Sequence, residues 1–141
     1  MTDEAYRAKQ VLQEYRQLER RVSEKTERLA ALMASATRAN SSTEATRVSG
    51  TGARSRVEQA VITIIDLESQ LDKSIDQKNA QRHAIQNAID AMKDEREARL
   101  LELRYIDGRS WASVMTRMGI GETYSRVIHE SALAHFAEIF F

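Results

Sequence analysis

The chain has 141 residues, of which 30% are charged and 6% aromatic, with five glycines and no proline. Because nothing in it forces a helix to end, and helix-forming Ala, Leu, Glu, Arg and Gln are abundant, we expect an all-α protein. The absence of cysteine excludes disulfides and thiolate metal sites, and the net charge of zero excludes nucleic-acid binding through bulk basic charge.

The sequence also bears on where the protein works. No apolar run approaches the ~20 residues that a membrane-spanning helix needs. The first residues, MTDEAYRAKQ, are charged and lack the apolar centre of a signal peptide. We therefore expect a cytoplasmic protein that makes no contact with a membrane.

Residues 1–34 are expected to form one amphipathic helix. Its apolar residues recur at alternating steps of three and four, and only Lys25 interrupts them. Such spacing over about three heptads predicts the seam of a coiled coil, with mixed charges on solvated flanks. The predicted seam residues are Ala8, Val11, Tyr15, Leu18, Val22, Leu29 and Leu32.

Residues 35–54 read SATRANSSTEATRVSGTGAR and lose this periodicity. Small and polar residues dominate the segment, which is typical of a flexible linker. Arginines give the segment a local positive charge, so the segment could contact phosphate groups. A solvated linker is the simpler interpretation.

Residues 55–95 are expected to form a second long coiled-coil helix. The predicted polar seam positions are Glu68, Lys78 and Arg82. The two long helices can pair as an antiparallel hairpin within one chain, or between chains as a homodimer, and the sequence does not choose. The predicted apolar seam residues are Val57, Val61, Ile64, Leu71, Ile75, Ile85, Ile89 and Met92.

Residues 96–141 contain three short apolar-periodic runs. The first run includes Leu100, Leu103 and Ile106 and ends at the turn signal Asp-Gly at 107–108. Ser110 is a suitable N-cap for a short helix over 111–118. The sequence GIG then predicts a tight turn before a third helix from about Glu122. Two helices joined by a short glycine-containing turn are typical of a helix-turn-helix module.

The stretch LLELRYIDGRSWASVMTRMGIGETYSRVIHESALAHF resembles region four of sigma-70-type transcription factors. More narrowly, the whole chain is similar to small phage and prophage proteins that are loosely akin to ArpU-like late-gene transcription regulators. The resemblance implies a DNA-binding transcription regulator that reads DNA with the helix at about 122–136 and has host RNA polymerase as a further partner. It rests on Leu103, Arg104, Tyr105, Val114, Met118, Gly119, Ile120, Arg126, Ile128, Ala132 and Leu133.

The candidate DNA-binding residues lie at the start of the third helix. They are Thr123, Tyr124, Arg126 and Val127, with Arg109 as a further candidate. Residues 96–141 contain six arginines and six acidic residues, so this part of the chain has no net charge.

No cofactor, metal or enzymatic activity is expected. The three histidines lack companion ligands at metal-binding spacing, and no phosphate-binding loop or nucleophile motif occurs. Two alternatives to a transcription regulator stay open. One is a DNA-packaging adaptor like a small terminase subunit, or another assembly adaptor, and the other is a purely structural coiled-coil protein.

Overall fold

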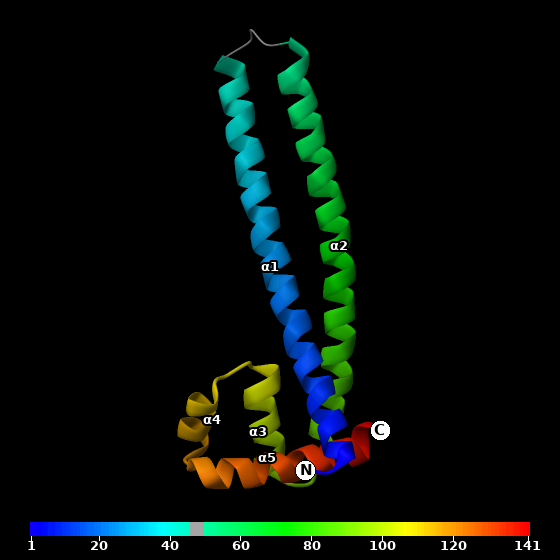
Figure 1. The fold of residues 1–141 in the computed structure, drawn as a ribbon, viewed down its shortest axis with the longest axis vertical. Helices are drawn as coiled ribbons and strands as arrows, with labels where there is room; N and C mark the ends of the chain where they lie inside the picture. Colours follow the sequence, from blue (N-terminus) through cyan, green and yellow to red (C-terminus); the bar gives the residue numbers. More distant parts are fainter. Residues whose placement is uncertain (46–49) are drawn as a thin grey trace. The chain divides into compact units, whose positions relative to one another are not determined.

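The computed structural model describes the backbone of residues 1–45 and 50–141, and the side chains of residues 1–38 and 55–141. In this part of the chain all regular elements are helical, which confirms the expected all-α class. None of the described helices is both long and apolar enough to cross a membrane. The elements are α1 (Asp3–Ala45), α2 (Gly50–Asp90), α3 (Glu95–Leu101), the π-helical segment η1 (Glu102–Ile106), α4 (Trp111–Met118) and α5 (Glu122–Phe140) (Figure 1).

These elements form two compact units. Unit 1 comprises Met1–Glu19 and Lys78–Phe141, and unit 2 comprises Arg20–Gln77. The long helices α1 and α2 therefore each contribute one part to unit 1 and the other part to unit 2.

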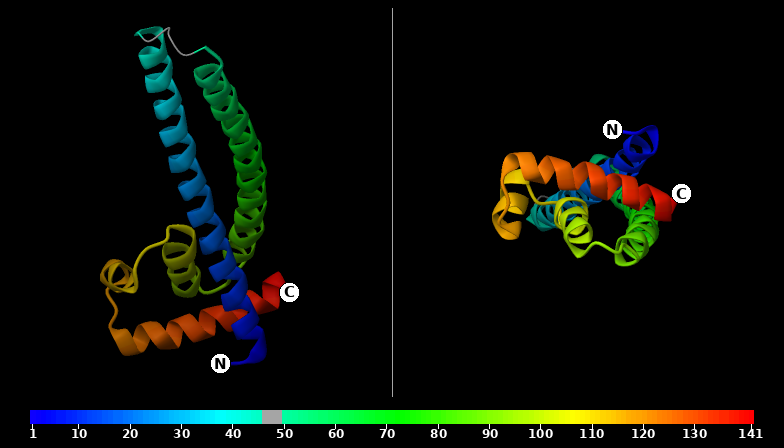
Figure 2. Two further views of the ribbon diagram at one scale, coloured as in Figure 1. Left: turned by 45° about the horizontal axis from the view of Figure 1, so that its top comes forward. Right: turned by 90° about the horizontal axis from the view of Figure 1, so that it is seen from below.

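Unit 2 is an antiparallel pair of helical segments from one chain (Figures 1 and 2). The Lys25 ammonium donates a 3.0 Å hydrogen bond to the Ser74 hydroxyl, which fixes how the two segments are aligned. Among the residues of unit 2 whose side chains are described, Val22 of α1 and Leu67 and Leu71 of α2 are the buried apolar ones.

The seam of α2 in unit 2 is shifted from the predicted one. Leu67 is buried and Ala60 half-buried, whereas Val61 is 48% exposed and Glu68 is exposed. The predicted places of Val61 and Glu68 in the seam are therefore wrong. Leu67 faces α1 because burying it removes apolar surface from water, whereas burying Glu68 would desolvate a carboxylate.

The structure also moves the predicted boundaries of the long helices. α1 continues past residue 34 to Ala45 and α2 starts at Gly50, so most of the predicted linker at 35–54 is helical. Residues 46–49 lie outside the described part of the chain. Ala, Ser and Thr are tolerated in helices, and no proline ends either helix. The second helix stops at Asp90, before the predicted end at 95, because Asp94 caps a new helix.

In unit 1, α5 crosses the first turns of α1 (Figure 2). There the Arg7 guanidinium lies 4.4 Å from the centre of the Phe141 ring. The seam predicted for the first turns of α1 is largely buried here, with Ala8 and Tyr15 fully enclosed. The largest fully buried side chains of unit 1 are Tyr15, Phe136, Leu12, Ile85, Ile89, Leu100, Leu101, Leu133 and Val114.

The π-helical segment η1 continues α3 directly and was not predicted. At the end of its wider turn, the backbone amide of Asp107 donates to the Glu102 carbonyl at 2.9 Å. The backbone amide of Arg109 donates to the Leu103 carbonyl at 3.0 Å. Short π-helical segments are uncommon and often accompany functional sites. Here Leu103, Tyr105 and Ile106 are all buried, and Tyr105 reaches a histidine of α5.

Candidate nucleic-acid interface

Local sequence signals set the bounds of α4. The Ser110 hydroxyl accepts a 3.2 Å hydrogen bond from the Ser113 amide, which satisfies one free donor at the helix start. Gly119 ends the helix with φ 66° and ψ 38°, the left-handed conformation that glycine adopts without strain. The predicted helix over 111–118 and its Ser110 cap are thus confirmed.

The turn Gly119–Gly121 leads directly into α5. Gly121 is the N-cap of α5 and provides no side-chain hydrogen bond. The amides at the start of α5 therefore lack a capping side chain, and a helix N-terminus of this kind carries partial positive charge. Figure 1 shows α4 and the start of α5 joined by this short turn.

One side of α5 is buried and anchors the helix in unit 1. Val114 of α4 and Phe140 of α5 belong to the same apolar cluster or pack against it. Ile128, Ala132 and Leu133, which are among the residues that carry the resemblance, are buried. The complete buried set on α5 is Ser125, Ile128, His129, Ala132, Leu133, Phe136 and Ala137.

Ser125 is buried at a position where an apolar residue would pack more simply. Its hydroxyl donates a 2.7 Å hydrogen bond to the Glu122 carbonyl one turn earlier. The hydroxyl therefore finds a partner within its own helix, which removes most of the cost of burying it. Ser125 therefore needs no polar contact with another element.

The opposite side of α5 exposes the four predicted side chains. Thr123, Tyr124, Arg126 and Val127 are all exposed, and Val127 is 60% exposed although it is apolar. Arg126 pairs with Glu122 at 2.8 Å, with side chains 77% and 72% exposed. An ion pair this open to water contributes little to stability, so the guanidinium can exchange Glu122 for another anion at low cost.

Arg96 of α3 is a cation beside this surface that sequence reasoning missed. Its Nη1 donates a 2.6 Å hydrogen bond to the Tyr124 hydroxyl, and its guanidinium lies 6.0 Å from the centre of the Tyr124 ring. The two residues are 28 positions apart, and no local pattern signals their contact. Tyr124 is therefore held by a neighbouring helix.

Arg109 is not placed with the four residues of α5. It lies between η1 and α4, is half-buried, and has its Nε atom enclosed without a hydrogen-bond partner. Its carbonyl accepts a 2.8 Å hydrogen bond from Arg104. The geometry assigns Arg109 to the loop that supports α4 rather than to the exposed surface of α5.

A buried polar contact connects η1 to α5. The Tyr105 hydroxyl lies 2.8 Å from Nε2 of His129. Burial lowers the pKa of His129 to about 4, with Lys9 and Arg104 acting in the same direction, and burial raises the pKa of Tyr105 to about 12. At neutral pH the Tyr105 hydroxyl therefore donates to a neutral imidazole.

Trp111 completes this support from α4. Its ring meets the His129 ring edge-on at 4.7 Å between centroids, and the Arg104 guanidinium lies 4.8 Å from its centre. Trp111 packs inward through these contacts, although the residue is only half-buried. The start of α4 is thereby attached to the middle of α5.

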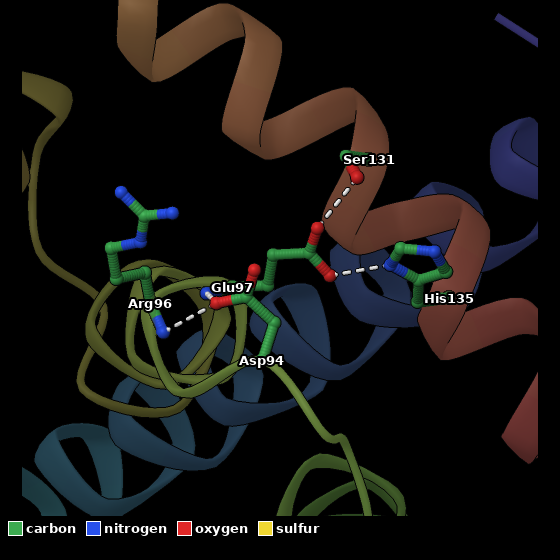
Figure 3. Close-up of polar contacts among 5 residues, drawn as sticks. All are labelled: Asp94, Arg96, Glu97, Ser131 and His135. Carbon is green, nitrogen blue, oxygen red and sulfur yellow. Dashed lines mark hydrogen bonds and ion pairs between the residues drawn. The ribbon is translucent and has the colours of Figure 1, made fainter.

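A second polar contact joins α3 to α5. Figure 3 shows the buried Glu97 carboxylate between Ser131 and His135. Ser131 donates a hydrogen bond of 2.5 Å to one oxygen, and Nδ1 of His135 lies 2.6 Å from the other. Hydrogen bonding and charge from Glu97 raise the pKa of His135. Asp94 caps the same helix by accepting from the Arg96 and Glu97 amides (Figure 3).

Neither polar contact resembles a metal site. No group of three His, Cys, Asp or Glu side chains with metal-binding geometry occurs in the described part of the chain. His129 and His135 instead each bond to one protein partner. Both contacts hold the helices that carry the exposed surface.

Comparison with known protein families gives one match. Residues 38–136 match the family described as "Protein of unknown function (DUF1492)", which is more than two thirds of the chain. The chain belongs to this family. The DUF1492 stretch contains α2, α3, η1, α4 and most of α5, and with them the exposed residues at the start of α5. No curated protein and no solved structure matches the chain significantly.

Proposed function

We propose that this DUF1492 protein is a DNA-binding transcription regulator that reads duplex DNA with the start of α5. The observation that supports it most is the exposed set Thr123, Tyr124, Arg126 and Val127 at the N-terminus of the second helix of a helix–glycine turn–helix pair. A recognition helix uses these positions to meet base edges in the major groove. The partial positive charge at the same helix end favours contact with phosphates.

The chemistry of the four side chains suits this task. A guanidinium such as that of Arg126 can form two hydrogen bonds with guanine or hold a phosphate. Val127 and the methyl group of Thr123 can contact the methyl group of thymine. Val127 is 60% exposed, so its apolar side chain is available for such a contact.

The helix-turn-helix module of residues 96–141 has no net charge, which limits the affinity with which it binds DNA by itself. Phosphate contacts provide much of the affinity of DNA-binding proteins, and each contributes to the salt dependence. A single neutral module is expected to bind weakly. We therefore propose that the protein acts as a homodimer through its long helices, and that host RNA polymerase is a further partner. The resemblance to late-gene regulators supports both a phage or prophage origin and action in the cytoplasm.

Binding of genomic DNA fragments, measured by mobility shift at several salt concentrations, tests the proposal. If Arg126 contacts a base, Arg126→Ala should weaken binding by about 1–3 kcal/mol. Arg126→Lys keeps the positive charge, so it should weaken binding to non-specific DNA less than Arg126→Ala does. If Arg126 touches only phosphate, all sequences should weaken alike and the salt slope should fall by about one. Circular dichroism checks that the fold is intact.

The matched control is Arg28→Ala, which removes the same charge from an exposed position of unit 2. It should leave binding unchanged. If Arg126→Ala combined with Tyr124→Ala binds DNA as tightly as the parent, the start of α5 does not read DNA. The exposed surface would then be assigned to a protein partner, and a pulldown against RNA polymerase and against packaging proteins would distinguish a regulator from an assembly adaptor.

A further inference from the structure

Arg96 of α3 and Tyr124 of α5 form a hydrogen bond whose direction is set by their chemistry. Nη1 of Arg96 lies 2.6 Å from the hydroxyl oxygen of Tyr124. A guanidinium carries N–H donors and no acceptor, so the tyrosine oxygen accepts in this contact. The hydroxyl proton of Tyr124 therefore takes no part in it and can be donated to another group.

The contact runs through the hydroxyl rather than through the face of the ring. The Arg96 guanidinium lies 6.0 Å from the centre of the Tyr124 ring, which is at the outer limit of a cation–π interaction. A hydrogen bond from a charged donor at 2.6 Å is the stronger of the two interactions. Removing the hydroxyl should therefore remove most of the attraction between the two side chains, although the ring would remain.

The helix that carries Arg96 is fixed on α5. Asp94 caps α3 by accepting hydrogen bonds from the Arg96 and Glu97 amides at 2.9 and 3.3 Å. Glu97 is buried and bonds to two side chains of α5 (Figure 3). The backbone of Arg96 is thus held against the helix that also carries Tyr124, so the guanidinium reaches the hydroxyl from a fixed position.

The other donors of Arg96 are open to a ligand. Figure 3 shows the guanidinium extending away from the carboxylates of Asp94 and Glu97. No carboxylate among the described side chains forms an ion pair with Arg96, whereas Arg126 pairs with Glu122. An exposed cation beside a free hydroxyl donor favours a ligand group that only accepts hydrogen bonds.

We propose that Arg96 fixes the Tyr124 hydroxyl as a donor, and that this hydroxyl pairs with an acceptor oxygen of the bound DNA. Arg96 acts through Tyr124 and is a positioning residue. The inference rests on the proposed function, because it specifies which groups of DNA the start of α5 contacts. The acceptor oxygen belongs to a backbone phosphate, or to guanine O6 or thymine O4 in the major groove.

The guanidinium makes this pairing selective. The amino group of adenine or cytosine only donates, so it would need the Tyr124 oxygen that already accepts from Arg96. It would also bring its partly positive hydrogens towards the guanidinium charge. Without Arg96 the hydroxyl can rotate and accept from such an amino group. Loss of Arg96 should therefore relax the preference for an acceptor oxygen.

Selection of bound sequences from random DNA duplexes by the full chain tests for a base partner. The parent should enrich guanine or thymine at one position of its site. Tyr124→Phe should lose this enrichment, and Arg96→Met should also admit adenine or cytosine there. Arg96→Lys keeps a head group that only donates and should keep the preference. Arg99→Met is the matched control, because it removes another exposed arginine of α3, and it should leave the preference unchanged.

Mobility shift on the enriched duplex tests for a phosphate partner. Single methylphosphonates are placed along the backbone, and each replaces one charged phosphate oxygen by a methyl group. One of them should weaken binding of the parent about 3- to 10-fold, as the loss of a hydrogen bond does. It should leave Tyr124→Phe unaffected and have a smaller effect on Arg96→Met. Circular dichroism should show unchanged helix content, since both substituted side chains are exposed.

The outcomes separate this inference from the proposed function. The inference is overturned if the parent binds DNA but neither the base preference nor any methylphosphonate effect depends on the Tyr124 hydroxyl. It is also overturned if Arg96→Met behaves like the parent in both measurements. In either case DNA binding by the parent would leave the proposed function intact. A parent that binds no DNA would overturn the proposed function, and the inference with it.

Discussion

The Glu97 carboxylate at the start of α3 lies 2.6 Å from Nδ1 of His135 on α5, and this contact raises the pKa of the histidine. The same carboxylate is buried and also accepts from Ser131, so one side chain holds two positions of α5 (Figure 3). Because α5 carries the exposed candidate residues, the contact helps to orient them. Its strength should depend on the protonation of His135.

The first prediction concerns this contact and pH. A histidine whose pKa is raised on folding stabilises the protein below its unfolded value of about 6.5, and the contribution disappears as pH rises through the folded value. The difference in unfolding free energy between the parent and His135→Asn should therefore be larger at pH 5.5 than at pH 8.5. Urea unfolding measures it. Glu130→Gln, which changes an exposed carboxylate of the same helix, should show no such trend.

His129 should respond to pH in the opposite direction. Its pKa is lowered to about 4, so the folded protein keeps it neutral while the unfolded chain binds a proton below about pH 6.5. Stability is then fully present above pH 6.5 and should fall by about 2–3 kcal/mol as pH drops towards 4. In His129→Gln, where an amide oxygen can still accept from Tyr105, the slope of unfolding free energy between pH 6.5 and 4.5 should flatten. An unchanged slope would show that His129 is not kept neutral.

The third prediction concerns Gly108, which has φ 70° and lies under the Arg16 guanidinium. A Cβ atom added there would come within 2.2 Å of Arg16 Nη2, so Gly108→Ala would displace a guanidinium that also pairs with Glu19. The backbone strain alone should cost about 1–2 kcal/mol. Gly119→Ala is the control, since φ is 66° but nothing lies within 4 Å.

Thermal unfolding should therefore rank Gly108→Ala only slightly below Gly119→Ala, because both variants share the backbone strain and the displaced atoms are the far end of a flexible side chain. In a background of Arg16→Ala the difference between the two glycine variants should disappear, because the displaced group is gone. If the two variants are equally stable in the parent background, Arg16 moves aside without cost.

The fourth prediction tests the seam register of α2. Leu67 and Leu71 are buried, so truncating either to Ala should cost about 2–5 kcal/mol. Ile75→Ala should cost less, because Ile75 is half-buried. Val61→Ala should change the unfolding free energy little, because Val61 is 48% exposed, and Glu68→Ala should be near neutral. Denaturant unfolding measures these costs, and equal costs for Val61→Ala and Leu67→Ala would restore the seam predicted from the sequence.

Local signals in the sequence determined the helices around the turn. The Ser110 side chain and Gly119 define the two ends of α4, and the spacing of Ile128, Ala132 and Leu133 identifies the buried side of α5. Capping and the left-handed glycine conformation depend on neighbouring residues alone, so they can be inferred without the fold. The same holds for the all-α class, which follows from composition and the absence of proline.

Other features required the tertiary structure. Leu67 rather than Glu68 faces α1, and Tyr105 within the π-helical segment reaches His129, because segments distant in sequence supply the packing partners. Arg96 beside Tyr124, and Glu97 between Ser131 and His135, likewise join α3 to a helix about 30 residues later. A polar side chain can be buried only where such a partner satisfies its hydrogen-bonding groups. A heptad pattern does not show which of two neighbouring registers buries more apolar surface. The sequence therefore determined where the helices around the turn begin and end, whereas only the tertiary structure decided which side chains hold them together.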